Sequence, residues 1–137
     1  MKVKLITKAN HWEFEKVKPL IRRVVTGAAH GEFSLDDLQY LIQDGRAFAG
    51  FVAEEDGTPV VAYVWEMIFY PRTTAVNVIA LGGKDFYRCC DWYWPFMQEV
   101  WRRQGATVVE CSSTPAMARF LQKAGFHEVY RVSRKEL

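Results

Sequence analysis

The 137-residue sequence lacks the features that mark several large classes of protein. Its three cysteines, Cys89, Cys90 and Cys111, are odd in number and do not have metal-ligand spacing, which argues against a disulfide framework or a zinc site. No apolar run is long enough to cross a bilayer, and the opening stretch Met1–Ile6 is too short and too polar for a signal peptide. We therefore expect reduced thiols and a cytoplasmic protein that makes no contact with a membrane.

The sequence also lacks a large excess of charge of either sign. Its net charge is +2 and no basic stripe stands out, so nucleic-acid binding has no electrostatic support. Half of the residues are hydrophobic and 15% are aromatic, a composition typical of a folded chain. Without repeats or linkers, this length predicts a single domain over residues 1–137.

The most informative stretch runs from Val76 to Gly105. The β-branched run Val76–Leu81 predicts a strand buried on both faces, and the pair Gly82-Gly83 predicts a sharp turn after it. Apolar residues then recur at helical spacing, with Asp85 as the expected N-cap. A strand that enters a helix through glycines can present free amides to a phosphate at the positive end of the helix dipole. A tight turn alone also explains the glycines, so both interpretations remain open.

The other elements follow from apolar periodicity, capping signals and turn residues. Asn10 with Glu13 is expected to begin a first helix kinked at Pro19, and Ser34 with Asp37 a second helix. The other predicted elements are strands at Val3–Thr7, Ala47–Glu54, Val60–Tyr70, Thr107–Cys111 and Glu128–Val132, and a helix from Thr114 to Gly125. The order β-α-α-β-β-β-α-β-α-β predicts an α/β (α+β) fold with a mixed sheet flanked by helices.

The segment Thr114–Phe126, TPAMARFLQKAGF, resembles a segment of the GNAT acetyltransferases. That family segment reads Asn-Pro-x-Ala, then an aliphatic-aromatic pair, then x-Lys-x-Gly-Phe, and here Pro115, Lys123, Gly125 and Phe126 fall in register. The predicted order of elements also resembles the GNAT fold over nearly the whole chain. The ALGG ending of the fourth strand is most similar to GNAT-like proteins encoded by tailed phages, whose pyrophosphate loop is shortened in this way.

The resemblance implies an N-acetyltransferase that uses acetyl-CoA to acylate a small-molecule or protein amine. It places these residues at the cofactor: Leu81, Gly82, Gly83, Lys84, Phe86 and Thr114. The chain departs from the family in its loop, which lacks the Arg/Gln-x-x-Gly-x-Gly/Ala spacing, and at Leu121, where a general-acid tyrosine is frequent. A catalytically silent GNAT fold, acting as a binding or phage virion-associated structural module, is therefore the alternative.

Acetyl transfer requires a base for the amine and a proton donor for the departing thiolate. Glu66 lies among apolar strand residues, where burial would make its carboxylate a stronger base, although it could equally pair with an arginine or reach solvent. Asn77 could hold a water or a substrate group, and Tyr87 could supply the missing proton. Both also have ordinary structural explanations, in backbone bonding for Asn77 and in core packing for Tyr87.

The predicted central helix carries more large aromatic residues than one core-facing stripe needs: Trp92, Tyr93, Trp94, Phe96 and Trp101. Some of these rings are therefore expected to face outward. Exposed aromatics of this size predict a homo-oligomer or a protein partner through the Trp92–Trp101 helix.

Overall fold

The computed structural model describes residues 1–27 and 29–137, with the side chains of residues 87 and 90–92 outside the description. Its centre is a five-stranded sheet in the order β1-β2-β3-β4-β5. The strands are β1 (Lys2–Ile6), β2 (Phe48–Ala53), β3 (Pro59–Phe69), β4 (Thr74–Gly83) and β5 (Val108–Glu110). The first four are antiparallel neighbours and β5 is parallel to β4, so the mixed sheet predicted from the sequence is confirmed.

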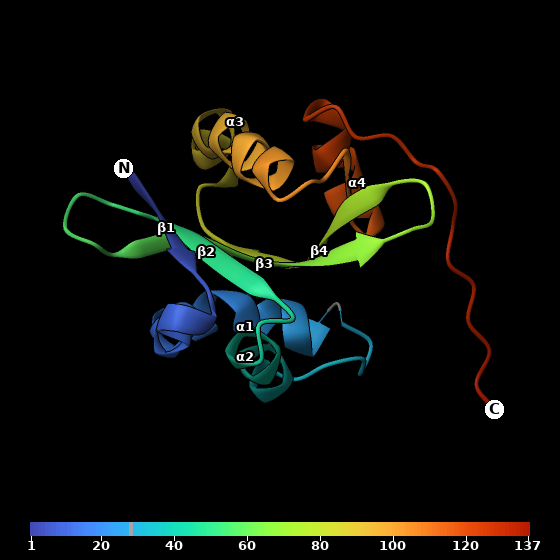
Figure 1. Ribbon diagram of the computed structural model, residues 1–137, viewed down its shortest axis with the longest axis horizontal. Helices are drawn as coiled ribbons and strands as arrows, with labels where there is room; N and C mark the ends of the chain where they lie inside the picture. The colour runs from blue at the N-terminus through green and yellow to red at the C-terminus, as the bar shows by residue number, and fades with distance from the viewer. Residues whose placement is uncertain (28) are drawn as a thin grey trace.

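Helices cover both faces of the sheet (Figure 1). The 3-10 helix η1 (Lys8–Lys16), α1 (Lys18–Gly27) and α2 (Leu35–Gln43) pack on one face, and α3 (Phe86–Arg103) and α4 (Pro115–Lys123) lie on the other. Alternation along β3 divides its side chains between the layers: Tyr63 and Trp65 join the core beneath α3, whereas Ala62 and Val64 join the core above α1. The α1 side therefore has the smaller strand residues here, which lets that helix approach the sheet closely.

The beginning of the first helical region differs from the prediction. Thr7, not Asn10, is the N-cap. The side-chain oxygen of Asn10 completes the capping box, and its Nδ2 donates a hydrogen bond to Glu13. The helical region is also divided at Val17, so Pro19 lies in the first turn of α1 and does not kink a continuous helix. Proline is accepted there because first-turn amides have no partner within the helix.

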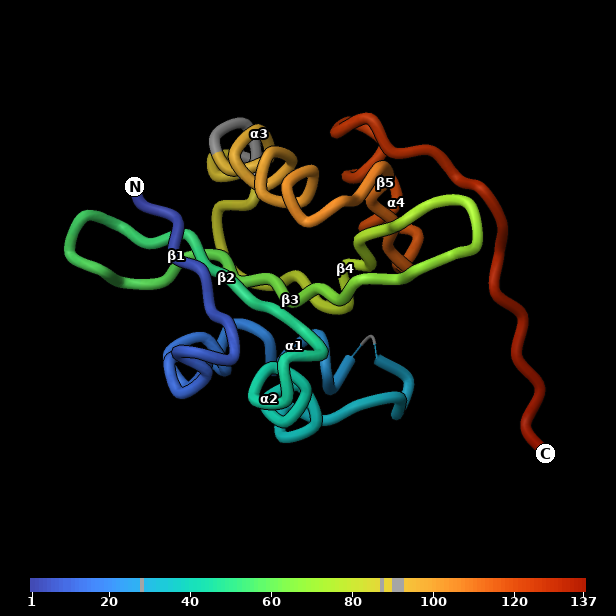
Figure 2. Tube along the Cα trace, viewed as in Figure 1, coloured from blue at the N-terminus to red at the C-terminus, as the bar shows by residue number. Residues whose placement is uncertain are grey.

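The last predicted strand, Glu128–Val132, is wrong. Residues 124–137 form neither helix nor strand, and this C-terminal tail runs past the turn between β3 and β4 toward the loop after α1 (Figures 1 and 2). Arg134 of the tail forms an ion pair with Glu32 of that loop. The apolar residues Val129 and Tyr130 are exposed. The alternating segment Glu128–Val132 therefore pairs with no strand of the described sheet.

Candidate active site

The pairing of β4 with the parallel strand β5 ends in the middle of β4. Their ladder is three residue pairs long and ends where Asn77 lies beside Glu110, although β4 continues to Gly83. Beyond Asn77, β4 has no strand neighbour on its β5 side in the described part of the chain. We call the unpaired edge of β4 beyond the Asn77–Glu110 pair, together with the end of β5, the V, and that pair its apex. Ligands of α/β proteins commonly bind where parallel strands diverge at their carboxyl ends.

A bulge lies close to this apex. The ladder between β3 and β4 pairs Val64 with Ala80 and Trp65 with Val78, which leaves Ile79 as the extra residue of β4. A bulged strand bends and twists locally. The bulge, two residues beyond Asn77, therefore bends β4 just past the point where its pairing with β5 ends.

Three polar residues form a row across the sheet at the apex. Glu66 of β3 is in register with Asn77 of β4, which is in register with Glu110 of β5. Asn77 Nδ2 donates a hydrogen bond to Glu66 Oε1 at 3.0 Å. The row lies on the α1 side, because the strand neighbours Met67 and Val76 pack beneath α3. The two candidates from the sequence are thus brought together, and Glu66 is half-buried.

Sequence reasoning missed Glu110 and its partner Tyr70. The Tyr70 hydroxyl donates a hydrogen bond to the Glu110 carboxylate. This bond is the main cause that raises the pKa of Tyr70, and a further hydrogen bond with Tyr130 of the tail adds to it. Only the parallel register of β4 and β5 connects Glu110 to Asn77, and no local pattern in the sequence reports that register.

The glycine pair at the other end of β4 is packed against backbone on both sides. A Cβ atom on Gly82 would lie 2.3 Å from the carbonyl oxygen of Leu20 in α1. A Cβ atom on Gly83, whose φ is +136°, would lie 2.3 Å from the carbonyl oxygen of Val60. The Lys84 amide donates to that same oxygen at 2.8 Å. Both glycines lie in β4 and pair with Ala62 and Val61 of β3, so the predicted turn at Gly82-Gly83 is wrong. Close packing explains both glycines without a ligand.

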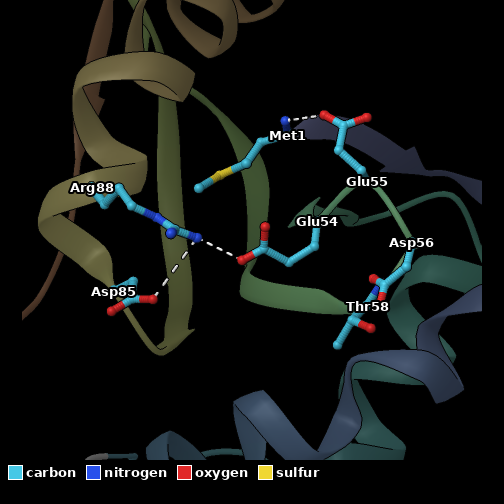
Figure 3. A network of polar contacts seen from close by, with 7 residues as sticks. All are labelled: Met1, Glu54, Glu55, Asp56, Thr58, Asp85 and Arg88. Carbon is cyan, nitrogen blue, oxygen red and sulfur yellow. Dashed lines mark hydrogen bonds and ion pairs between the residues drawn. The ribbon is translucent and has the colours of Figure 1, made fainter.

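Charged side chains from α3 and from the turn after β2 meet at the start of α3 (Figure 3). Asp85 occupies the N-cap position, but its backbone is left-handed and its side chain makes no capping hydrogen bond, so the predicted cap is wrong. Its carboxylate instead lies 3.9 Å from Arg88, whose guanidinium is 2.6 Å from Glu54 of the turn after β2. The first-turn amides of this 18-residue helix thus receive no cap from Asp85 at the positive end of the dipole.

Comparison with known proteins identifies the architecture. No protein-family model and no curated protein sequence matches the chain. A tetramutant of the BH1408 protein from Bacillus halodurans matches over 100% of both chains, with a TM-score of 0.75 and 11% identity. An aminoglycoside acetyltransferase from an uncultured soil metagenomic sample, in complex with sisomicin, matches over 99% of this chain and 95% of that chain, with a TM-score of 0.71 and 13% identity.

A further structure carries a cofactor. The aminoglycoside N-acetyltransferase AAC(6')-Iy in complex with CoA matches over 99% of this chain and 93% of that chain, with a TM-score of 0.70 and 14% identity. The chain has the GNAT acetyltransferase fold. Identities this low show the GNAT fold alone, because one fold hosts many functions.

Three other residues that the GNAT resemblance placed at the cofactor have structural roles. Leu81 is 9% exposed and belongs to the core beneath α3. Phe86 packs edge-on against Phe120 of α4, with ring centroids 5.9 Å apart. The Thr114 hydroxyl accepts a hydrogen bond from a first-turn amide of α4 and caps that helix. The side chain of Tyr87, the predicted proton donor, lies outside the described residues.

The aromatic residues of α3 in this GNAT fold are mostly internal. Tyr93 and Trp101 are buried, and Trp94 is half-buried against both of them and Phe126. Phe96 is 48% exposed and is the one exposed aromatic residue among the described side chains of α3. The side chain of Trp92 lies outside the described residues. Among the described residues, the predicted partner surface therefore consists of the exposed side of α3 around Phe96.

A separate cavity of about 260 Å³ lies beside the turn that joins β2 and β3. Its lining comes from β1, η1, β2 and that turn, and not from the V between β4 and β5. The described residues contain no group of histidine, cysteine or carboxylate side chains suited to a metal ion. None of the described helices has the length and apolar character needed to cross a membrane.

Proposed function

We propose that this chain is a GNAT-fold N-acetyltransferase that moves an acetyl group from acetyl-CoA to an amine. The observation that carries the proposal is the polar row of Glu66, Asn77 and Glu110 at the apex of the V, which the second half of β4 joins to the positive end of α3. The strand between Asn77 and Gly83 is roughly 20 Å long at about 3.3 Å per residue. An extended acyl-CoA has chemistry for both ends, a thioester for the polar row and a diphosphate for the helix.

The residues present fit an acyl-CoA only in part. The unpaired edge of β4 beyond Asn77 offers backbone groups to the amides of a pantetheine arm, as in strand addition. The diphosphate would be held by the first turn of α3 and by the Lys84 side chain. The Lys84 amide, however, is bonded to Val60, and the carboxylate of Asp85 stands at the same helix end. We therefore expect weaker binding than a full pyrophosphate loop would give.

Glu66 is the general base in this proposal. Asn77 Nδ2 holds Glu66 Oε1 and so orients the carboxylate, while no described side chain donates to Oε2, which is left to accept the proton of the amine. Glu110 adds a second negative charge to the row, which favours the approach of a cationic small-molecule or protein amine. The bound acyl donor supplies an activated carbonyl. Tyr87 remains the candidate that protonates the departing thiolate.

Thiol release from acetyl-CoA in the presence of a panel of amines tests the proposal. We expect turnover with at least one amine, and a loss on the order of a hundredfold in kcat for Glu66→Gln. Glu99→Gln is the matched control, because Glu99 is exposed on α3 and pairs with Arg102 and Arg103. Absence of thiol release with every amine, together with no change in Tm at millimolar acetyl-CoA, would contradict the proposal.

The alternative is a catalytically silent GNAT fold that serves as a binding or phage virion-associated structural module. Two observations favour it: close packing accounts for Gly82 and Gly83, and the Lys84 amide is already bonded. In this alternative the exposed side of α3 around Phe96 binds a second copy or another protein. Acetyl-CoA would then leave Tm unchanged at any accessible concentration.

A further inference from the structure

We propose that the cavity beside the β2–β3 turn is a binding site for a small zwitterion, such as a free α-amino acid with an apolar side chain. The cavity has a volume of about 260 Å³, and its lining comes from β1, η1, β2 and the turn. None of the three residues of the polar row at the apex of the V lines it. The inference therefore goes beyond the proposed function and does not depend on it.

Buried apolar side chains of β2 form the floor of the cavity. Phe51 and Ala53 line it, belong to the core on the α1 side, and are 4% and 1% exposed. They are in register with Lys4 and Lys2 of β1, respectively. Residues directly opposite on neighbouring strands have Cβ atoms about 5 Å apart, so one small molecule can contact both the floor and the lysines.

The lysines of β1 supply the positive end of the cavity. Lys2 and Lys4 point to the α1 side, because their strand neighbours Val3 and Leu5 pack beneath α3. Neither ammonium group has a hydrogen bond or an ion pair among the described residues. Lys2 acts on Glu55 only through space, where it adds a small part to the lowering of the pKa that the bond from the amino terminus mainly causes.

The third lysine of the lining is already paired within η1. Lys16 Nζ lies 3.1 Å from Glu13 Oε1, and Asn10 Nδ2 donates a hydrogen bond to Glu13 Oε2 at 2.6 Å. The bond from Asn10 and then the bond from Lys16 are the main causes that lower the pKa of Glu13, and the charge of Lys4 adds a small part. Both oxygens of Glu13 are thus occupied, and Lys4 is left to bind an anionic group.

The β2–β3 turn supplies the negative end of the cavity. Glu54 and Glu55 form ion pairs with α3 and with the amino terminus of the chain, respectively (Figure 3). Asp56 has no ion pair with any described side chain. Hydrogen bonds from the amide of Thr58, and next from its side chain, lower the pKa of Asp56. A carboxylate accepts up to about four hydrogen bonds, so Asp56 can also bind an ammonium group.

This arrangement of charges selects the class of ligand. A polyanion would meet the carboxylates of the turn, and a polycation would meet the lysines of β1. A zwitterion can place its carboxylate at Lys2 and Lys4, its ammonium group at Asp56 and an apolar side chain over Phe51. The cavity of about 260 Å³ has room for about eight water-sized groups of about 30 Å³ each, which is close to the size of leucine.

Titration of the full chain with L-leucine, followed by the NMR shifts of the backbone amides of β1 and the turn, measures the Kd. We expect a Kd of about 1 mM, because so small a ligand makes few contacts. Lys4→Gln and Asp56→Asn should each raise the Kd about two- to fivefold, the effect of one exposed ion pair. Lys135→Gln and Asp44→Asn make the same changes of charge outside the lining and should leave the Kd unchanged.

Analogues of the probe test the assignment of a zwitterion. N-acetyl-L-leucine lacks the ammonium group, L-leucinamide lacks the carboxylate, and glycine lacks the apolar side chain. Each should bind about threefold or more weakly than L-leucine. Equal or tighter binding of N-acetyl-L-leucine or L-leucinamide would overturn the assignment.

Two other results would overturn the site itself. The first is the absence of a saturable shift in β1 and the turn up to about 50 mM L-leucine, far above the expected Kd. The second is a Kd for both Lys4→Gln and Asp56→Asn equal to that of their control variants. Thermal unfolding of each variant shows whether it is folded, and Asp56→Asn, in an exposed turn, keeps the test open if Lys4→Gln fails to fold. Acetyl-CoA is not part of the titration, so failure of this site leaves the proposed function standing.

Discussion

Replacing Gly82 with alanine should destabilise the protein strongly, because α1 lies directly against β4 at this point. The added Cβ atom would lie 2.3 Å from the Leu20 carbonyl oxygen and 3.3 Å from Val24 Cγ2. Gly82 is not in the left-handed region, so steric overlap with α1 is the whole cost. The obstacle at Leu20 is backbone, which cannot rotate away as a side chain can.

The size of the effect follows from the movement required. Carbon and carbonyl oxygen approach to about 3.3 Å without strain, so α1 and β4 must separate by about 1 Å. Overpacking of a core costs about 1–3 kcal/mol, and the upper end applies where backbone must shift. We expect a loss of about 3 kcal/mol in the free energy of unfolding, which lowers Tm by roughly 10 °C in a chain of this length.

Urea and thermal unfolding followed by circular dichroism measure this loss, with Gly27→Ala as the control. Gly27 ends α1, and a Cβ atom there would meet nothing within 4 Å. Its replacement should leave stability unchanged or slightly raised, because alanine restricts the unfolded chain. A Gly82→Ala protein within about 0.5 kcal/mol of wild type, the range of ordinary surface substitutions, would refute the close approach of α1 to β4. The glycine pair would then need the ligand-based explanation.

Three further predictions concern single side chains. Ser34→Ala should cost about 1 kcal/mol by urea unfolding, because Ser34 caps α2, whereas Ser133→Ala in the tail should cost nothing measurable; equal stabilities would remove the capping role. Burial raises the pKa of Cys111 to about 11, so its alkylation by iodoacetamide should be slow at pH 8 and accelerate toward pH 11; fast reaction at pH 8 would contradict this burial. If the exposed side of α3 forms an interface, Phe96→Lys should reduce the mass measured by light scattering with an unchanged Tm, and a wild type that is monomeric at high concentration would exclude that interface.

Local signals in the sequence were sufficient for much of the fold. Ser34 and Asp37 form the predicted capping box, and the strand and the helix from Val76 onward occur as expected, although the strand continues through Gly82 and Gly83. Each of these depends on residues only a few positions apart, where hydrogen bonding and periodicity decide the structure. Asp85 shows the limit of such signals. Its left-handed backbone differs from the extended geometry of a capping residue, and its carboxylate faces Arg88 instead of the amides.

Non-local contacts explain what the sequence did not reveal. Glu110 joins the candidate site only because parallel pairing sets it beside Asn77, and that register depends on the packing of the whole crossover helix. The requirement for glycine at position 82 comes from Leu20, in a helix much earlier in the chain. Glu128–Val132 has the alternation of a strand but no partner in the described sheet, and alternation alone does not supply one.

The middle of β4 and the start of α3 have different roles in the proposed activity, so rate and affinity can be tested separately. In the proposal, Asn77 orients Glu66 for proton transfer, which affects chemistry after the substrates are bound. The Lys84 side chain at the start of α3 is proposed to hold the diphosphate, which affects only how tightly the donor binds. An enzyme should therefore show a higher Kd for Lys84→Gln with unchanged kcat, and a lower kcat for Glu66→Gln with unchanged Kd. A silent module has neither quantity to lose, and both variants would then differ from wild type only in stability.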